Sequence, residues 1–222
     1  MTDKEYHRAH ITIGKDILAD MPAEEFSGKI CVIDTLDKVE SAVRELRAAD
    51  IIGFDTETRP SFHKGQYYNV SLVQLSTPDS CYLFRTNLIG WPEELISIFE
   101  DPKLIKVGLS LHDDFHNIRK QIEFDPQSFI DLQNYVKQFK IADNSLSRVY
   151  GILFGKRISK GQRLTNWEIN NLTEAQLNYA ALDAWACIKI YRYLEKGLFD
   201  PKKSAFLTLP QEPKIEEIKI DK

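Results

Sequence analysis

Residues 51–58 read IIGFDTET, an apolar run that leads into two acidic residues. Its apolar first half predicts a strand that is buried inside a sheet. Asp55 and Glu57 are two positions apart, so their side chains emerge on the same face of that strand. Carboxylates set into an apolar segment are costly to hold there unless a cation compensates them, and a metal ion fits that need best. The alternative is a strand end at which polar side chains meet solvent.

The segments around this strand predict a layered α/β fold. Ahead of it, residues 29–35 (KICVIDT) have the pattern of a strand and residues 36–48 that of an amphipathic helix. After it, strands at 70–75 and 81–84 flank a Thr-Pro-Asp turn, which is typical of an antiparallel hairpin. Helices and strands then alternate, with a helix at 92–99, a strand at 104–109, a helix at 113–121 and a strand at 129–131. This order predicts a mixed sheet with helices on both faces.

A long helix is predicted at 173–196. Thr173 and Gln176 have the pattern of a capping box, and Gly197 offers a C-terminal stop. Tyr179 and Asp183 are four residues apart and therefore share a face. Apolar side chains occupy that face and the opposite one, so the helix and its aspartate are expected to be largely buried. For Tyr179 the ordinary alternative is a ring in the core with its hydroxyl at the surface.

A further acidic candidate lies in the sequence HDDF, which contains Asp113 and Asp114. An acid in the first turn of a helix is also favoured by the helix dipole, and this is the alternative interpretation. By helical angle Asp114 lies beside the apolar stripe, whereas Asp113 points roughly opposite to it; the stripe consists of Leu111, Phe115, Ile118 and Ile122. We therefore expect Asp114 to be the site residue and Asp113 to be the helix cap.

The composition fits one large domain, because 43% of the 222 residues are hydrophobic. We expect residues 29–197 to form this domain, with an N-terminal extension at 1–28 and a C-terminal extension at 198–222 outside its core. The net charge of −4 excludes binding to polyanions through overall charge. Any contact with nucleic acid therefore has to be local or mediated by a metal.

Signals for export and for metal-thiolate sites are missing from the sequence. No stretch approaches the ~18 apolar residues of a membrane span, and the first residues lack the apolar core of a signal peptide. The three cysteines have no CxxC spacing, which argues against a zinc site or a disulfide framework and favours buried, reduced thiols. We therefore expect a cytoplasmic protein without a membrane partner.

Three motifs that contain these acids occur in a recognisable order. They are FDTET at 54–58, KVGLSLHDD at 106–114 and YAALDA at 179–184. In this order they resemble the DEDDy branch of the DnaQ-like 3′-5′ exonucleases, the group that contains RNase D and the Werner-type exonuclease domain. The resemblance spans about residues 29–197 and implies an RNase H-like mixed sheet that carries a 3′-5′ exonuclease domain.

This resemblance implies a metal-dependent hydrolysis of phosphodiester bonds at the 3′ end of DNA or RNA, which releases nucleoside monophosphates. Two divalent cations, Mg²⁺ or Mn²⁺, would be held by Asp55, Glu57, Asp114 and Asp183. Hard cations prefer carboxylate oxygens, and two of them stabilise both the attacking and the leaving oxygen of an in-line displacement. Tyr179 would orient the attacking water, because a tyrosine with a pKa near ~10 is a poor base at neutral pH.

A local basic cluster precedes the last helix and could contact substrate phosphates. It consists of Lys156, Arg157, Lys160 and Arg163. Lys160 and Arg163, together with Thr58 at the end of the first motif, are the candidates for substrate binding. The alternative for the cluster is an ordinary solvated loop.

An aromatic segment follows the first motif and could stack on a base. It contains Phe62, His63, Tyr67 and Tyr68. Tyrosine and phenylalanine near the start of a strand are more often part of the core, and His63 is expected at the surface rather than as a ligand. The expected substrate is a single-stranded or 3′-recessed nucleic acid.

Two other functions are compatible with the same fold. One is a catalytically weak nucleic-acid-binding or interaction module, which the complete set of four acids and one tyrosine disfavours. The other is a two-metal phosphohydrolase that acts on small phosphate esters, which the basic cluster disfavours. The choice between DNA and RNA and the oligomeric state are left open by the sequence.

Overall fold

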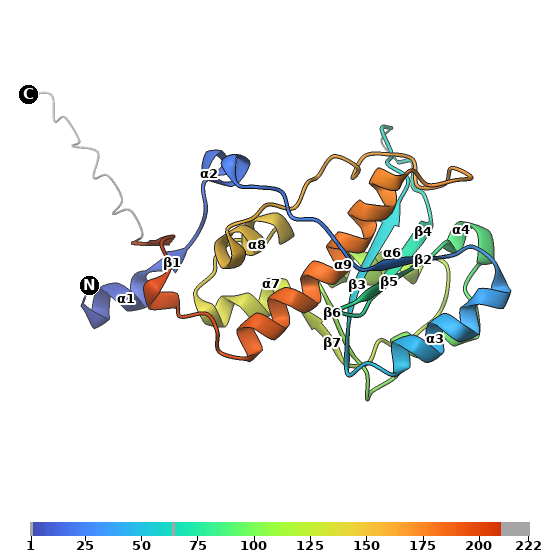
Figure 1. The fold of residues 1–222 in the computed structure, drawn as a ribbon, viewed down its shortest axis with the longest axis horizontal. Coiled ribbons are helices and arrows are strands. Elements are labelled where there is room, and N and C mark those ends of the chain that lie inside the picture. The colour runs from blue at the N-terminus through green and yellow to red at the C-terminus, as the bar shows by residue number, and fades with distance from the viewer. Residues whose placement is uncertain (1, 64, 210–222) are drawn as a thin grey trace, which may run out of the picture.

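A six-stranded mixed sheet forms the centre of the computed structural model, which describes residues 2–63 and 65–209 of the chain (Figure 1). In spatial order the strands are β2 (Lys29–Ile33), β5 (Ser80–Phe84), β4 (Val70–Ser76), β3 (Ile51–Thr58), β6 (Ile105–Gly108) and β7 (Phe129–Asp131). The three central strands β3, β4 and β5 are antiparallel, and the outer pairs β2–β5, β3–β6 and β6–β7 are parallel. The predicted mixed sheet and its antiparallel hairpin are confirmed.

Nine α-helices connect and cover the strands in the described part of the chain. They are α1 (Asp3–Arg8), α2 (Lys15–Asp20), α3 (Val39–Arg47), α4 (Thr86–Ile89), α5 (Glu93–Phe99), α6 (Leu111–Ile118), α7 (Leu132–Tyr135), α8 (Leu146–Phe154) and α9 (Glu174–Glu195). Short 3-10 helices occur at Leu36–Lys38, Val136–Phe139 and Pro201–Lys203. The long helix α9 lies against the sheet and also packs on α8 (Figure 1).

The alternation of side chains along β3 divides the core into two layers. Ile51 belongs to a cluster with α8 and α9, whereas Ile52 and Phe54 belong to a second cluster with α3, α5 and α6. Successive side chains of a strand point to opposite faces, so the sheet is covered by helices on both sides. This arrangement confirms the predicted fold class.

The limits of α9 follow from local signals at its two ends. The Thr173 hydroxyl accepts a hydrogen bond from the Gln176 backbone amide, and the Gln176 side chain accepts one from the Thr173 backbone amide. Gly197 follows the helix with a φ of +65°, a left-handed conformation that favours glycine. The predicted capping box and helix stop are therefore confirmed.

The N-terminal segment is part of the core, and the expectation that residues 1–28 lie outside it is wrong. Ile11, Ile13 and Phe26 are buried in the cluster that contains α8 and α9. A Cβ atom at Gly151 of α8 would lie 2.7 Å from the Leu18 side chain and 3.6 Å from that of Ile13. The segment covers an apolar face of α8, which is the physical reason for its burial.

The two ends of the described chain meet in a small second sheet. Strand β1 (His10–Ile11) pairs antiparallel with β8 (Leu207–Thr208), and Figure 1 shows them side by side. Residues 210–222 of the predicted C-terminal extension lie outside the described residues. All three cysteines are free thiols; Cys81 and Cys187 are buried, as predicted, whereas Cys31 is only partly buried, so the prediction is wrong for it. None of the helices in 2–63 or 65–209 is both long and apolar enough to cross a membrane.

Candidate active site

Three carboxylates meet where the end of β3 lies against the middle of α9. Asp55, Glu57 and Asp183 each contribute one oxygen to a group in which these atoms lie within 4.8 Å of one another. Glu57 and Asp183 are buried, with 9% and 7% of their surface exposed, and Asp55 is partly buried. The sequence predicted that Asp55 and Glu57 lie on one face of a strand. The fold adds Asp183 from α9, the helix that covers this face.

Gly53 allows the close contact between β3 and α9 that brings these acids together. A Cβ atom at this position would lie 1.9 Å from the Ala184 carbonyl oxygen and 3.1 Å from the Ile188 side chain. A side chain at this position would therefore force the helix away from the strand, because the helix backbone touches the strand. The sequence interpretation missed this role, although an isolated glycine inside a predicted strand is a known sign of close backbone approach.

Asp114 approaches the same strand end from the other layer of the fold. Strand β6 pairs only with residues 51–53 of β3, which leaves the later part of β3 open on that side for α6. The Thr56 hydroxyl donates a hydrogen bond to the Asp114 carboxylate. Asp114 lies outside the group of three carboxylates but is close enough for its charge to raise the pKa of Glu57.

The start of α6 is held by an aspartate that the sequence interpretation did not single out. Asp131, at the end of β7, accepts hydrogen bonds from the backbone amides of Ser110 (3.0 Å) and Leu111 (3.2 Å). Ser110 has a φ of +65° and occupies the N-cap position, so the expectation that Asp113 caps the helix is wrong. The Asp113 side chain is 81% exposed, as its helical angle predicted.

Tyr179 lies beside Asp183 and is packed against a buried tryptophan. Its ring centroid is 6.0 Å from that of Trp167, which has no exposed surface. Burial raises the pKa of Tyr179, and the charges of Asp183, Glu57 and Asp55 raise it further. The hydroxyl is thus held in its protonated form beside the Asp183 carboxylate. Trp167 belongs to the TNWEINNL segment, and its contact with the tyrosine became apparent only in the fold.

The electrostatics of the site favour a bound cation. Burial raises the pKa of all four acids, and neighbouring carboxylates raise those of Asp55, Glu57 and Asp114 further. The pKa of Glu57 rises to about 10, and that of Asp183 to about 7 although Tyr179 and Lys160 oppose the rise. Between residues 2 and 209, leaving out 64, the ion pairs all involve other acids. Clustered carboxylate oxygens without a cationic partner fit hard divalent cations.

The fold divides the predicted basic cluster into two pairs. Lys156 forms an ion pair with Glu24 at 2.9 Å, and Arg157 donates through Nε to the Met21 carbonyl at 3.1 Å. These two side chains hold the N-terminal segment. Lys160 and Arg163 are exposed, and their charges lower the pKa of Asp183 and of Glu57, respectively. The second pair is therefore available beside the acids.

Thr58 and the aromatic segment lie at the open end of β3. The pairing of β3 with β4 shifts by one residue between Glu57 and Thr58, so the ladder is irregular there. Beyond it, a cleft of about 440 Å³ is lined by residues that include Arg59, Phe62 and Tyr68. Phe62 is 76% exposed and Tyr67 is 78% exposed, so both rings lie outside the core. His63 is also exposed, as predicted.

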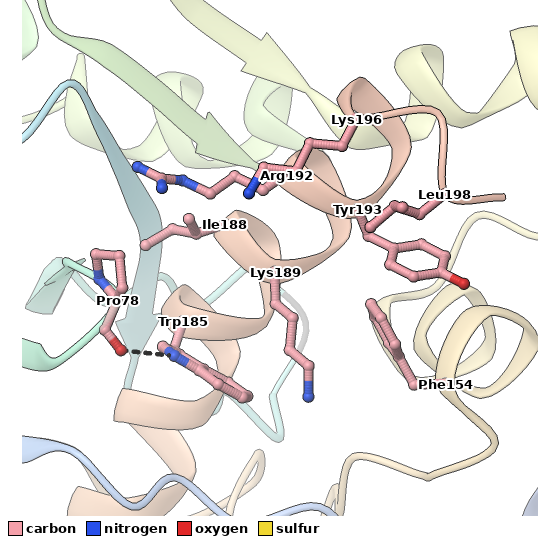
Figure 2. Close-up of a pocket in the computed structure, with 9 residues that line it drawn as sticks. All are labelled: Pro78, Phe154, Trp185, Ile188, Lys189, Arg192, Tyr193, Lys196 and Leu198. Atoms are coloured by element: carbon pink, nitrogen blue, oxygen red, sulfur yellow. Dashed lines mark hydrogen bonds between the residues drawn. The ribbon is translucent and has the colours of Figure 1, made fainter.

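A pocket of about 340 Å³ on a different side of α9 lacks such chemistry (Figure 2). Its lining is mostly apolar and includes three cations, of which Lys189 pairs with Glu24 and Arg192 pairs with Asp50. The Trp185 indole nitrogen donates a hydrogen bond to the Pro78 carbonyl oxygen, and the two atoms are 3.0 Å apart. Figure 2 draws this hydrogen bond as a dashed line. Arg192 is nine residues from Asp183, which places it about half a turn away around the helix. The candidate active site is therefore the acidic group and not this pocket.

Comparison with known proteins identifies the family. The model of a 3′-5′ exonuclease family matches residues 30–198. The mouse protein named bifunctional 3′-5′ exonuclease/ATP-dependent helicase WRN is 30% identical over 193 residues, which cover 82% of this chain and 14% of that protein. A 3′-5′ exonuclease of Arabidopsis thaliana is 31% identical over 197 residues, covering 79% of this chain and 67% of the relative.

A solved structure supports the same conclusion. The crystal structure of Escherichia coli RNase D, an exoribonuclease involved in structured RNA processing, superposes with a TM-score of 0.68 at 25% identity. The match covers 76% of this chain and 44% of that one. The chain belongs to the 3′-5′ exonuclease family, within the DnaQ-like superfamily that the motifs predicted. It spans only a small part, 14% and 26%, of two of its curated relatives.

Proposed function

We propose that this protein is a metal-dependent 3′-5′ exonuclease that hydrolyses the terminal phosphodiester bond of DNA or RNA and releases nucleoside monophosphates. The observation that carries the proposal is the group formed by partly buried Asp55 and buried Glu57 and Asp183, whose ligand oxygens lie within 4.8 Å of one another. Burying several negative charges close together is unfavourable in free energy unless a cation binds between them. Membership of the 3′-5′ exonuclease family supports the same reaction.

The four acids would hold two divalent cations, Mg²⁺ or Mn²⁺. When bound, two such cations would stabilise the negative charge on the attacking oxygen and on the leaving oxygen during in-line displacement at phosphorus. Asp55, Glu57 and Asp183 would supply ligand oxygens from the acidic group, and Asp114, which accepts a hydrogen bond from the Thr56 hydroxyl, would supply another from beside it. Burial of the group on an ordered strand and helix keeps the ligand geometry rigid.

Tyr179 is proposed to position the attacking water rather than to remove its proton. Its hydroxyl lies beside Asp183, and its pKa is raised above the ordinary value. A hydroxyl that stays protonated at neutral pH can donate or accept a hydrogen bond but is a poor general base. Packing against Trp167 limits the orientations of the ring and so fixes the direction of this hydrogen bond.

We propose that the nucleic-acid substrate enters the site between the exposed cations Lys160 and Arg163 and the aromatic segment that contains Phe62. Lys160 and Arg163 carry the positive charge that a phosphate next to the acids requires. The exposed ring of Phe62 offers a face for base stacking without sequence preference. Thr58 directly follows Glu57 at the irregular end of β3, where the chain continues into this segment. We infer that the substrate presents an unpaired 3′ end, as a single strand or an overhang.

The test is a ladder assay on matched DNA and RNA strands labelled at the 5′ or the 3′ end, with Mg²⁺, Mn²⁺ or a chelator. The expected result with the wild type is a metal-dependent ladder of shortened 5′-labelled products, from DNA, RNA or both. Asp55→Ala and Asp114→Ala should abolish it, and Asp113→Ala serves as the control because that side chain points to solvent. Equal activity of the Asp55 and Asp113 variants would refute the site.

The same assay separates the remaining alternatives. An interaction module would bind the strands without any metal-dependent shortening. Cleavage of a circular single strand would identify an endonuclease, and turnover of only a small phosphate ester would identify a phosphohydrolase. Each of these outcomes would overturn the proposed function.

A further inference from the structure

Gln74, in the middle of β4, is a fully buried polar side chain without a hydrogen-bond partner. It has no exposed surface, and neither its Nε2 nor its Oε1 atom is bonded to any part of the chain that the structure describes. Leaving a buried polar group unpaired costs roughly 1–3 kcal/mol, so such groups are rare in folded proteins. An apolar residue of similar shape would avoid this cost, which makes the presence of the glutamine informative.

The register of the sheet places Gln74 directly beside the acidic group. It is the residue of β4 that lies opposite Asp55 of β3. Residues that face each other across an antiparallel pair project on the same side of the sheet, with their Cβ atoms about 4.5–5.5 Å apart. Leu72, two positions earlier, belongs to the cluster under α9, so Gln74 and Asp55 both project toward that helix.

Within the described residues, the other sheet neighbours of Gln74 form no hydrogen bond with its side chain. On the far side, β5 places the apolar Leu83 opposite Gln74. Along β4, Leu72 is apolar, and the Ser76 hydroxyl is already used as a donor to the Thr77 and Ser80 carbonyls. Asp55 is the residue directly opposite Gln74 on β3, and its carboxylate can accept a hydrogen bond from the glutamine amide.

We propose that Gln74 is a positioning residue for the metal site, which donates a hydrogen bond from its side-chain amide to the Asp55 carboxylate when the site binds a divalent cation. An ionised carboxylate only accepts hydrogen bonds, so the donor has to be Nε2. One oxygen of Asp55 would then face the cation and the other would be held by Gln74, which fixes the orientation of the ligand. This inference rests on the proposed function, because it requires the acids to bind a metal.

The expected change in metal affinity can be taken from similar hydrogen bonds to metal ligands in other proteins. Removing a partner that orients a metal ligand typically weakens metal affinity about 10–100-fold. Stability should move in the other direction, because replacing the unpaired amide by an apolar group of similar size removes a buried polar group. A purely structural glutamine would show no change in metal affinity, so the two readouts distinguish the roles.

The experiment is a calorimetric titration of the metal-free protein with Mn²⁺, together with its thermal unfolding without metal. The variants are Gln74→Met, Gln74→Leu as a second apolar replacement, and Leu83→Met as the matched control from the same layer. We expect both Gln74 variants to unfold at or above the wild-type temperature and to bind Mn²⁺ 10–100-fold more weakly. Leu83→Met should retain wild-type affinity.

A double-mutant cycle with Asp55→Asn tests whether Gln74 acts through the aspartate. If it does, Gln74→Met should weaken Mn²⁺ binding far less in the Asp55→Asn background than in the wild type. Folded Gln74 variants with wild-type Mn²⁺ affinity would overturn the inference and leave the proposed function intact. If Asp55→Ala itself binds Mn²⁺ like the wild type, the proposed metal site fails instead.

Discussion

Replacing Gly53 with alanine tests whether the contact between β3 and α9 builds the acidic site. The added Cβ would stand 1.9 Å from the Ala184 carbonyl oxygen, and real Cβ atoms essentially never approach closer than 3.0 Å. The helix has to move away by about 1.1 Å, next to Asp183, to restore that separation. A displacement of ~1 Å in a catalytic group costs on the order of 10²-fold in rate, and overpacking costs about 1–3 kcal/mol in stability.

The measurements are the rate of 5′-labelled ladder formation, the affinity for Mn²⁺ and the unfolding temperature. We expect the rate to fall about 10²-fold, the affinity to weaken, and the unfolding temperature to fall by ~2–4 °C for each kcal/mol lost. Gly14→Ala is the control, because its Cβ would meet nothing closer than 4.0 Å, in the Ile17 side chain. A Gly53→Ala protein with lowered stability but unchanged rate and metal affinity would refute the claim that this contact positions the acids.

Three further predictions concern the tyrosine, the exposed cations and the N-terminal segment. Tyr179→Phe should keep its affinity for Mn²⁺ and lose about 10²-fold in rate, and unaltered nuclease activity would exclude the positioning role. Changing both Lys160 and Arg163 to alanine should weaken oligonucleotide binding. The slope of the logarithm of the binding constant against the logarithm of the salt concentration should become less steep by ~0.7 for each lost phosphate contact. An unchanged slope in fluorescence anisotropy titrations would contradict this prediction. Hydrogen bonds to Glu24 from Tyr150 and two lysines outweigh the effect of burial and lower its pKa from 4.5 to about 2. This stabilisation is complete above pH 4.5 and is lost as the pH falls toward 2, so the difference in unfolding free energy between wild type and Glu24→Gln should shrink over that range, from roughly 1–3 kcal/mol. A difference that stays constant with pH would argue against the assigned contacts.

Local sequence patterns correctly predicted where a side chain lies when its position depends only on near neighbours in the chain. The alternation in IIGFDTET placed Asp55 and Glu57 on one face, and the capping box placed the start of α9. Helical angle separated the exposed Asp113 from Asp114. These features depend on the periods of strands and helices, which a single segment already contains.

The same methods failed where the decisive contact joins distant segments. The four basic residues at 156–163 look equivalent in sequence, yet two of them bind the N-terminal segment and two remain beside the acids. The N-terminal segment itself carries mixed charge, and only the apolar surface of α8 explains why it is buried. No period along the chain records such a pairing.

Composition and periodicity indicated the class of fold, the succession of strands and helices between residues 29 and 131, and the residue types that could hold a cation. The tertiary structure decided which of these acids meet, because Gly53 lets α9 approach β3 closely enough to bring Asp183 to Asp55 and Glu57. It also decided that Gln74 lies unpaired beside Asp55, since the partner of a strand residue is set by sheet register. Residue type and period are local properties, whereas register and interlayer distance arise only when separate segments pack together.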